Sequence, residues 1–360
     1  MSSISRPRVS WRILLFVGVG LAVLILYLYY FIGTAKVGAA IEKTNPIIYA
    51  TAFLAFLASA TFYSIAWQSF LHNLGVKVKI REALLFGWAG MFFDVVIPDP
   101  GWSGDITKAY MLSKASGQET GRMIASVVSQ KTVVAAVTTI SLILGLVLYG
   151  LHYPLGGDIF IFVVAVLLLT TFSFFILVYL SINQKATTRI LNWIVRAAFF
   201  LGRGRWNLQS FRTQAEQLLN RFHEGIRTLT AHPRTLARPI LFSLLAWGFD
   251  ISIIFLTFAS LGYAVPADKV LIVYALTGSL QAFGVSFLGF TEIIVSGSYA
   301  VLGIPPAVSI TATLLVRVVT LWFKLIVSYF FFQFAGVKLL VGKSGEAERT
   351  GLSNMEDGRE

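Results

Sequence analysis

The sequence predicts an all-α, polytopic membrane protein with about six full transmembrane helices and two re-entrant helical hairpins, arranged as an inverted repeat. Three observations favour this class. First, 56% of the 360 residues are hydrophobic and only 13% are charged, whereas about a quarter of a soluble domain is charged. Second, many apolar runs are long enough to cross a bilayer. Third, Lys and Arg residues are concentrated in the segments predicted for one side of the membrane.

Six apolar runs reach the length of about 20 residues that a helix needs to cross a hydrocarbon core of about 30 Å. The first run is interpreted as an uncleaved signal anchor, because it is longer than the apolar region of a signal peptide. Two shorter runs, 83–97 and 270–303, are interrupted by proline or glycine. The six long runs lie near residues 13–33, 46–71, 123–150, 158–182, 239–262 and 308–336.

The positions of the basic residues predict the orientation. If the N-terminus is cytoplasmic and both interrupted runs return to the side they came from, 23 Lys or Arg residues fall inside, ten of them in the segment 183–238. Only Lys36, Lys43 and Lys269 fall outside. We therefore expect a multi-pass protein of the cell membrane with both termini cytoplasmic. This placement explains the net charge of +12 without a nucleic-acid partner.

A single transmembrane domain is expected over residues 1–340, followed by a polar, disordered tail at 341–360. Within this domain, 183–238 is predicted to be a cytoplasmic connector. Its apolar residues recur at helical spacing beside arginines, which is typical of an amphipathic helix on a membrane surface. Two interpretations stay open, a simple connector or a site for anionic lipid or a partner. A homo-oligomer is also left open.

The first interrupted run ends in the polar stretch Asp94–Lys108, which holds three carboxylates, two prolines and two glycines. Prolines cannot donate backbone hydrogen bonds, so the helix must break near Pro98. The glycines permit a reversal, and Asp105 is expected to cap or charge the N-terminus of a returning helix over 105–114. Unpaired backbone at membrane depth requires protein or a water-filled cavity. The stretch predicts a polar cavity open to the cytoplasm, lined by Asp94, Asp99, Ser103 and Asp105.

The second interrupted run follows the same logic with different residues. Three glycines, the last of them Gly289, loosen the helix, and Glu292 places a carboxylate at the start of the next helix. A glycine-weakened full span is the alternative. The units 46–150 and 239–336 would then have opposite orientations. Inverted repeats with broken helices are a known transporter arrangement.

Charged residues inside apolar runs are the main pointers to function, because each is costly near the bilayer centre unless it is paired or hydrated. Arg317 and Lys324 are seven residues apart and share a helix face with Thr320. A basic face opposite carboxylates suits an anionic headgroup, although some of these charges are alternatively structural ion pairs. The candidate headgroup and cavity residues are Asp94, Pro98, Asp99, Ser103, Gly104, Asp105, Lys108, Gln130, Lys131, Asp250, Gly289, Glu292, Arg317, Thr320 and Lys324.

Catalytic motifs give little support for an enzyme. The GWSG sequence at 101–104 matches the GxSG of rhomboid proteases, but the four histidines fall in loops or at interfaces, out of reach of a serine nucleophile. There is no HExxH, CxxC, Walker or DDxxD pattern and no cysteine. We therefore predict no catalytic residue, no metal site and no cofactor. An enzymatic role is left open without a motif to support it.

Three sequence blocks point to a family. In the first block, Asp94, Pro98, Gly104, Asp105 and Lys108 stand where the family has Asn, Pro, Gly, Glu and Arg, so most positions keep the chemical class of the side chain. In the second block, Gln130 and Lys131 stand where the family has Glu and Arg. The third block keeps Gly289, Glu292, Gly303 and Arg317, whereas Val285, Ser286 and Phe287 stand where the family has Pro-Gly-Gly.

On these blocks, residues 10–340 of the chain resemble the transmembrane, flippase-type domain of lysylphosphatidylglycerol synthases, which also occurs as stand-alone membrane proteins. The resemblance implies a domain that moves or holds lipids. It also implies that aminoacyl transfer belongs to a soluble domain, for which no segment of this chain is long enough.

The leading hypothesis is a protein that binds and translocates a phosphate-bearing lipid, of the phospholipid or polyprenyl-phosphate type, between the two hairpins. Arg317 and Lys131 would bind phosphate, and Lys108 would guard the inner mouth. Glu292, Asp94 and Asp105 would orient the headgroup or balance its charge. One alternative is a membrane-embedded transferase or accessory factor acting on polyprenyl-phosphate-linked sugars or aminoacyl lipids. Another is a scaffold that transports nothing.

Overall fold

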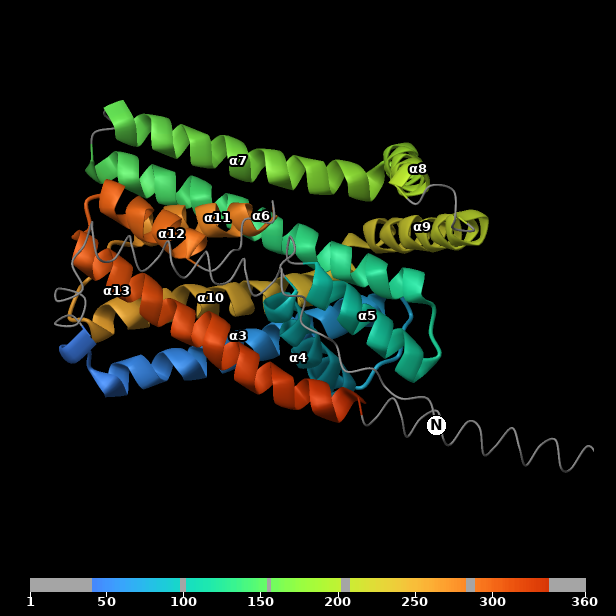
Figure 1. Cartoon of the computed structure of the whole chain (residues 1–360), viewed down its shortest axis with the longest axis horizontal. Coiled ribbons are helices and arrows are strands. Elements are labelled where there is room, and N and C mark those ends of the chain that lie inside the picture. Colours follow the sequence, from blue (N-terminus) through green and yellow to red (C-terminus); the bar gives the residue numbers. More distant parts are fainter. Residues whose placement is uncertain (1–40, 98–101, 154–156, 202–207, 283–288, 337–360) are drawn as a thin grey trace, which may run out of the picture.

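The computed structural model describes residues 41–97, 102–153, 157–201, 208–282 and 289–336, and all regular structure in these ranges is helical (Figure 1). The predicted anchor at 13–33 and the tail 341–360 lie outside these residues. The elements are α3 (Pro46–Asn73), α4 (Ile80–Val96), α5 (Ser103–Ser116), α6 (Thr120–His152), α7 (Gly157–Ile182), α8 (Gln184–Leu201), α9 (Leu208–Ala231), η2 (Pro233–Leu236), α10 (Ala237–Ser260), α11 (Ala267–Ala282), α12 (Phe290–Val301), α13 (Pro306–Arg317) and η3 (Val318–Phe323).

Five helices of the described ranges are long and apolar enough to cross a membrane. They correspond to the five predicted spans that fall within these ranges. The last of them is not a uniform α-helix, because α13 is followed by the π-helical turn η3 before the α-helix resumes and continues to Gly336. The five candidate spans are Pro46–Asn73, Thr120–His152, Phe160–Ile182, Pro233–Ser260 and Pro306–Gly336.

Helices α3 and α10 pack antiparallel and define the two ends of the bundle. At one end, the backbone N–H of Asn45 donates to the carbonyl oxygen of Ser260 at 2.7 Å. At the other end, the side-chain amide of Asn73 donates to the carbonyl oxygen of Thr235 at 2.8 Å. We call these the Asn45 end and the Asn73 end. Each receives one of two pairs of short helices.

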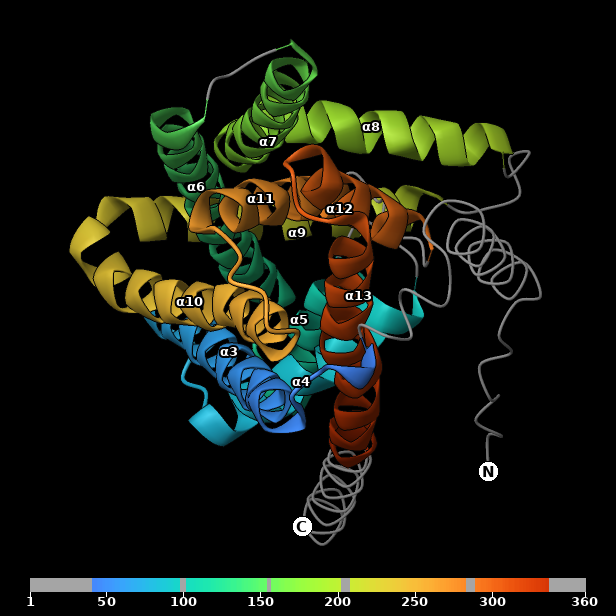
Figure 2. The ribbon, with the colours of Figure 1, turned by 90° about the vertical axis from the view of Figure 1, so that its left-hand side faces the viewer.

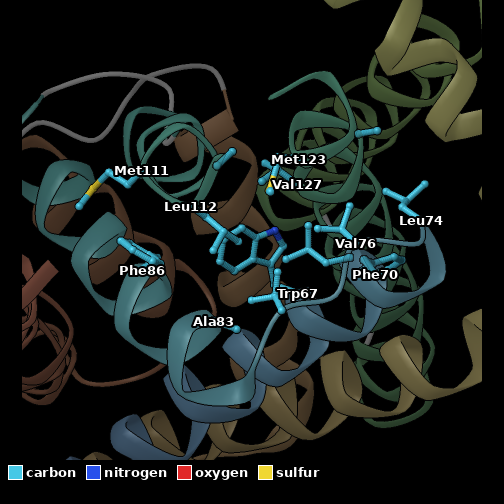
Figure 3. Packing of buried hydrophobic residues seen from close by; sticks show 14 of the residues in the cluster. Trp67, Phe70, Leu74, Val76, Ala83, Phe86, Met111, Leu112, Met123 and Val127 are labelled. Atoms are coloured by element: carbon cyan, nitrogen blue, oxygen red, sulfur yellow. The ribbon is translucent and has the colours of Figure 1, made fainter. Parts of the chain in front are cut away.

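The pair α4–α5 starts and finishes at the Asn73 end. Leu74, which precedes α4, and Met123, which follows α5, belong to one apolar core with Phe222 of α9. Trp67 of α3, which has no exposed surface, lies at the centre of this core (Figure 3). The end of α4 lies beside the start of α5, because Ser103 and Gly104 donate hydrogen bonds to Phe93 and Asp94, so the two helices run in opposite directions. The residues at which the reversal was predicted, 98–101, lie outside the described residues.

Two glycines let α4 and α5 approach closely. A Cβ atom added to Gly90 of α4 would lie 2.6 Å from the carbonyl oxygen of Gly104 of α5, and a Cβ on Gly104 would clash with the Gly90 carbonyl. A distance under 3 Å cannot be accommodated by rigid backbone. The close packing of the pair therefore requires glycine at both positions.

The pair α11–α12 starts and finishes at the opposite, Asn45 end. Val265, which precedes α11, packs in one apolar cluster with Leu302 and Ile304, which follow α12. Helix α12 begins after Gly289, whose φ of 89° lies in the left-handed region that favours glycine. The start of α12 therefore lies where the glycine-rich interruption was predicted.

The connector between α7 and α10 contains two helices. Helix α8 runs across the end of α7, end-on in Figure 1 and lengthwise in Figure 2, and α9 packs against α6. The contact between α9 and α6 is tight, because a Cβ on Gly225 would lie 2.7 Å from the Cβ of Ala125. His223 of α9 is buried and lies 2.7 Å from the hydroxyl of Thr187 in α8. The predicted amphipathic connector is thus a helical layer at the Asn73 end.

Candidate functional site

A cavity of about 1000 Å³ lies between the two helix pairs and is lined by residues from α3 to α7 and from α10 to Leu325. It brings together most of the predicted site. Ser103, Gln130 and Gly289 do not line it, and Pro98 and Asp99 lie outside the described residues. The predicted site residues that line the cavity are Asp94, Gly104, Asp105, Lys108, Lys131, Asp250, Glu292, Arg317, Thr320 and Lys324.

Asp94, near the end of α4, caps the start of α5. Its Oδ1 accepts a hydrogen bond from the backbone N–H of Gly104 at 2.9 Å. Its Oδ2 lies 3.7 Å from Nζ of Lys324. The first N–H groups of a helix have no partner within the helix, and a carboxylate satisfies them and the positive end of the helix dipole. Asp94 therefore caps α5, whereas Asp105 places its carboxylate in the first turn of the helix, which is the other role that the sequence analysis allowed.

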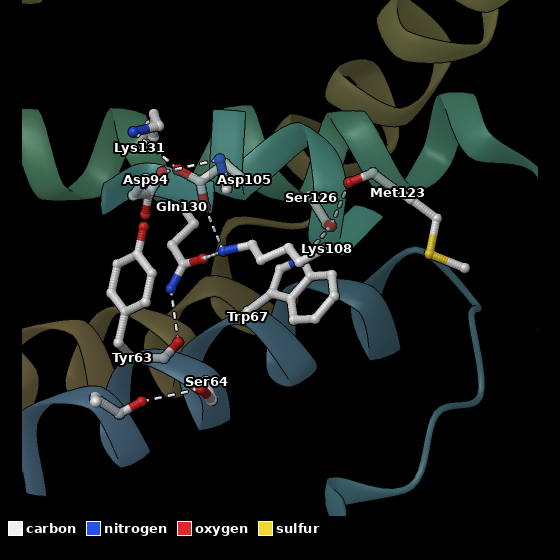
Figure 4. A network of polar contacts seen from close by, with 12 residues as sticks. Tyr63, Ser64, Trp67, Asp94, Asp105, Lys108, Met123, Ser126, Gln130 and Lys131 are labelled. Atoms are coloured by element: carbon white, nitrogen blue, oxygen red, sulfur yellow. Dashed lines mark hydrogen bonds and ion pairs between the residues drawn. The ribbon is translucent and has the colours of Figure 1, made fainter. Parts of the chain in front are cut away.

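Asp105 is instead the centre of a buried ionic network (Figure 4). Its Oδ1 lies 2.5 Å from Nζ of Lys108, and its Oδ2 lies 2.8 Å from Nζ of Lys131. Lys108 also donates to Oε1 of Gln130 at 3.3 Å, and the Gln130 amide donates to the carbonyl oxygen of Tyr63 at 2.7 Å. One carboxylate thus holds two ammonium groups, and the amide of Gln130 links Lys108 to α3.

Lys108 is not at an open mouth, as the sequence analysis expected, because only 2% of the residue is exposed. Its ammonium group lies 4.8 Å from the ring centroid of Tyr63 and 4.9 Å from that of Trp67. Aromatic faces stabilise a desolvated cation. The spacing of three residues from Asp105, one helical turn, explains why Lys108 folds back into the network rather than toward solvent.

Glu292 and Arg317 form the corresponding site at the second helix pair. Oε2 of Glu292 accepts from the backbone N–H of Gly289 at 2.6 Å, and Oε1 accepts from Nε of Arg317 at 2.6 Å. Glu292 is 2% exposed. The Nη2 atom of Arg317 is buried and has no hydrogen-bond partner among the described residues. A buried donor without a partner is costly, and this nitrogen could donate to a further acceptor.

Asp250 and Thr320 complete the predicted residues of the cavity. Oδ1 of Asp250 accepts from the hydroxyl of Ser59 at 2.6 Å, which links α10 to α3. Thr320 donates to the carbonyl oxygen of Val316 at 2.9 Å. Ser103, outside the cavity lining, donates to the carbonyl oxygen of Phe93 at 3.1 Å and joins α5 to α4.

Two features of the site were not predicted. Tyr63 lines the cavity from α3, and its hydroxyl points toward Asp94 (Figure 4). The π-helical turn η3 lies between Arg317 and Lys324. A π turn adds a residue to one helical turn and is frequent at functional sites. The apolar sequence VVTLWF of this turn gives no signal of it.

Comparison with known proteins agrees with the resemblance inferred from the three sequence blocks. Residues 11–328 match the family model described as lysylphosphatidylglycerol synthase TM region. The similar proteins include a UPF0104 membrane protein of Methanothermobacter thermautotrophicus, 24% identical over 86% of this chain and 91% of the relative. Another, from Pyrococcus horikoshii, is 22% identical over 75% and 82% of the two chains, and one from Methanocaldococcus jannaschii is 24% identical over 85% and 90%.

Proposed function

The chain belongs to the lysylphosphatidylglycerol synthase TM region family and is a multi-pass helical membrane protein, and from this premise we propose that it binds and translocates a phosphate-bearing lipid. The lipid headgroup would occupy the cavity between the two helix pairs. The volume of about 1000 Å³ is at the upper end of the range for ligand pockets, about 300–1,000 Å³. The ligand would be a lipid of the phospholipid or polyprenyl-phosphate type.

The observation that carries this proposal is the guanidinium group of Arg317. Its Nε binds Glu292, whereas its buried Nη2 has no partner among the described residues. Arg317 lines the cavity together with Lys131 and Lys324. A guanidinium binds phosphate oxygens by directed, charge-assisted hydrogen bonds, and the two ammonium groups that line the same cavity would add attraction. A phosphate in the cavity would therefore satisfy a donor that the protein leaves unsatisfied.

The arrangement of the helix pairs supports two re-entrant hairpins. The pair α4–α5 starts and finishes at the Asn73 end, and α11–α12 starts and finishes at the Asn45 end. We propose that the two ends face opposite sides of the cell membrane, with the Asn73 end and both termini cytoplasmic. The units 46–150 and 239–336 would then form an inverted repeat around the cavity. Such a site can exchange a headgroup between the two leaflets.

Exposed apolar residues in the lining also support this proposal. Ile176 of α7 and Trp322 of η3 line the cavity and are 39% and 51% exposed. These side chains join the polar cavity to the apolar outer surface of the helix bundle. Such a connection suits a lipid whose headgroup enters the cavity while its tails stay in the bilayer. We propose that the tails lie along these residues.

The test is transport by purified protein in liposomes that contain a fluorescent phospholipid. We expect transbilayer movement, and we expect Arg317→Ala to slow it at least about tenfold, since a hydrogen bond to a charged group contributes roughly 1.5–3 kcal/mol. Arg122→Ala is the matched control, because Arg122 is 41% exposed and pairs with Glu119 away from the cavity. Full activity of Arg317→Ala would refute the site.

The same samples separate the alternatives. Extraction of the lipids followed by mass spectrometry would show a chemical change if the protein is a transferase. Lipid that neither moves nor changes would favour an accessory or scaffold role.

A further inference from the structure

The charges of the described residues that line the cavity balance. Among the described residues that line it, four are acidic and four are basic, and none is a histidine. Three of the four carboxylates have a cation within ion-pair distance. Asp105 has two such cations. The acidic residues are Asp94, Asp105, Asp250 and Glu292, and the basic residues are Lys108, Lys131, Arg317 and Lys324.

Asp250 is the exception among the carboxylates. Its carboxylate accepts a hydrogen bond from the hydroxyl of Ser59, and no Lys or Arg of the described residues lies within 4 Å of it. The other groups that act on it electrostatically are Tyr63 of α3, Tyr274 of α11 and Lys324, which follows η3 and pairs with Asp94. Asp250 is therefore the carboxylate of the cavity whose charge is not compensated by a direct partner.

The protonation of Asp250 decides the net charge of the described lining. With all these carboxylates ionised, the described lining is neutral and a phosphate would bring an uncompensated negative charge to membrane depth, which costs several kcal/mol. With a proton on Asp250, the described lining carries one positive charge. That charge matches a headgroup whose net charge is −1. A phosphomonoester or diphosphate with two negative charges would still leave one charge unbalanced.

We propose that the cavity binds a phosphodiester lipid headgroup of net charge −1 together with one proton, which is carried by Asp250. This inference rests on the proposed function, and it narrows the ligand from phosphate-bearing lipids in general to monoanionic phosphodiesters. The proton enters with the lipid and leaves with it, so lipid movement would be linked to the proton gradient. The ion pairs of Asp94, Asp105 and Glu292 keep their charges throughout.

Binding of short-chain phosphatidylglycerol to the purified full chain, followed by calorimetry between pH 5.5 and 8.5, tests this inference. The ligand does not titrate in this range. We expect tight binding at low pH, where Asp250 is protonated. As the pH rises and Asp250 ionises, the Kd should increase about tenfold per pH unit, because linkage of one proton gives a slope of one. Asp250→Asn, which stays neutral, should bind at the low-pH affinity at every pH.

Asp268→Asn is the matched control, since Asp268 is a buried carboxylate that does not line the cavity, and this variant should keep the pH slope of the wild type. A second measurement does not depend on any variant. Titrations of the wild type in two buffers with different ionisation enthalpies count the protons bound with each lipid. We expect about one proton when the experiment is done on the sloping part of the profile.

The outcomes are distinguishable. No binding of phosphatidylglycerol or of the short-chain phosphomonoester at any pH would refute the proposed function itself, whereas binding of the phosphomonoester alone would refute the inference. Binding without a pH slope, a slope that persists in Asp250→Asn, or zero protons in the two-buffer experiment would refute the proton inference and leave lipid binding intact. Equal or tighter binding of a short-chain phosphomonoester, tested at pH 8 where it is a dianion, would refute the charge match.

Discussion

The replacement Glu292→Gln tests whether the second helix pair is held by a truly buried ion pair. The Glu292 side chain is 2% exposed and that of Arg317 is 18% exposed, at an N–O distance of 2.6 Å. Glutamine keeps the shape but turns one carboxylate oxygen into an NH₂ donor. That donor would face either the N–H of Gly289 or the guanidinium, the two donors that Glu292 now accepts from.

The expected loss follows from this geometry. Removal of one partner of a buried pair leaves the other charge uncompensated and costs about 3–5 kcal/mol. We expect a loss of this size in the free energy of unfolding, measured by denaturant titration in mixed micelles. The matched control is Glu119→Gln, because Glu119 is 46% exposed and pairs with Arg122 at 3.1 Å and with Arg221 at 3.4 Å, both of them exposed. An exposed pair contributes about 0–1 kcal/mol.

A double variant separates two contributions to the loss of stability, the lost attraction between Glu292 and Arg317 and the cost of leaving Arg317 unpaired. In Glu292→Gln combined with Arg317→Leu, no buried charge is left at this position, so most of the lost stability should return. The reasoning would be refuted if Glu292→Gln cost no more than Glu119→Gln. In that case the guanidinium would be stabilised by water or by another group, and its buried Nη2 would not be a free donor for phosphate.

The remaining predictions concern packing, topology and the connector. Gly104→Ala should destabilise the α4–α5 pair by about 1–3 kcal/mol through overpacking and speed its hydrogen exchange, whereas Gly150→Ala, with open space around the Cβ position, should not. The chain has no cysteine, so a single introduced cysteine can be labelled without background. Gln118→Cys should react with an impermeant maleimide only from the cytoplasm, and Lys43→Cys only from outside. The reverse pattern would overturn the proposed topology. Burial lowers the pKa of His223 below its ordinary value, so the folded protein binds protons less readily than the unfolded chain and stability should fall as the pH drops through about 6.5. His223→Gln should show a weaker fall of the unfolding midpoint between pH 7.5 and 5.5, and an unchanged fall would contradict this.

The sequence was sufficient for features that depend on local chemistry. Apolar runs of span length predicted five helices that the structure contains, because length and composition alone decide whether a helix can cross a bilayer. The start of α12 could be placed from Gly289, since a φ of 89° is accessible to glycine at little cost. Most charged residues of the cavity could also be named from the sequence, because a charge within an apolar run needs a partner and therefore attracts attention.

The sequence was insufficient for contacts that depend on how helices meet. Asp105 was expected to cap or charge the start of α5. It lies in the first turn of this helix, but the cap comes from Asp94, ten residues before Gly104 on the preceding helix. That choice depends on the close approach of α4 and α5, which no local pattern encodes. The burial of Lys108 under Tyr63 is likewise a consequence of packing between α5 and α3.

The last span links the two helix pairs, and this suggests how a headgroup could pass between them. At each break, a carboxylate binds a backbone N–H at the start of a helix, Asp94 at α5 and Glu292 at α12. Each carboxylate is paired with a cation from the last span, Lys324 and Arg317, which lie on either side of the π turn η3.

A phosphate that draws one of these cations away weakens the charge compensation of that break and leaves the other break unchanged. The 3.7 Å pair of Lys324 with Asp94 is longer than the 2.6 Å pair of Arg317 with Glu292, so Lys324 is the cation that a phosphate can recruit at lower cost. We therefore expect Lys324→Met to impair entry of the headgroup from the side of α4–α5 more than from the side of α11–α12. Transport assays with lipid labelled in one leaflet at a time would measure that difference, and equal impairment from both sides would contradict it.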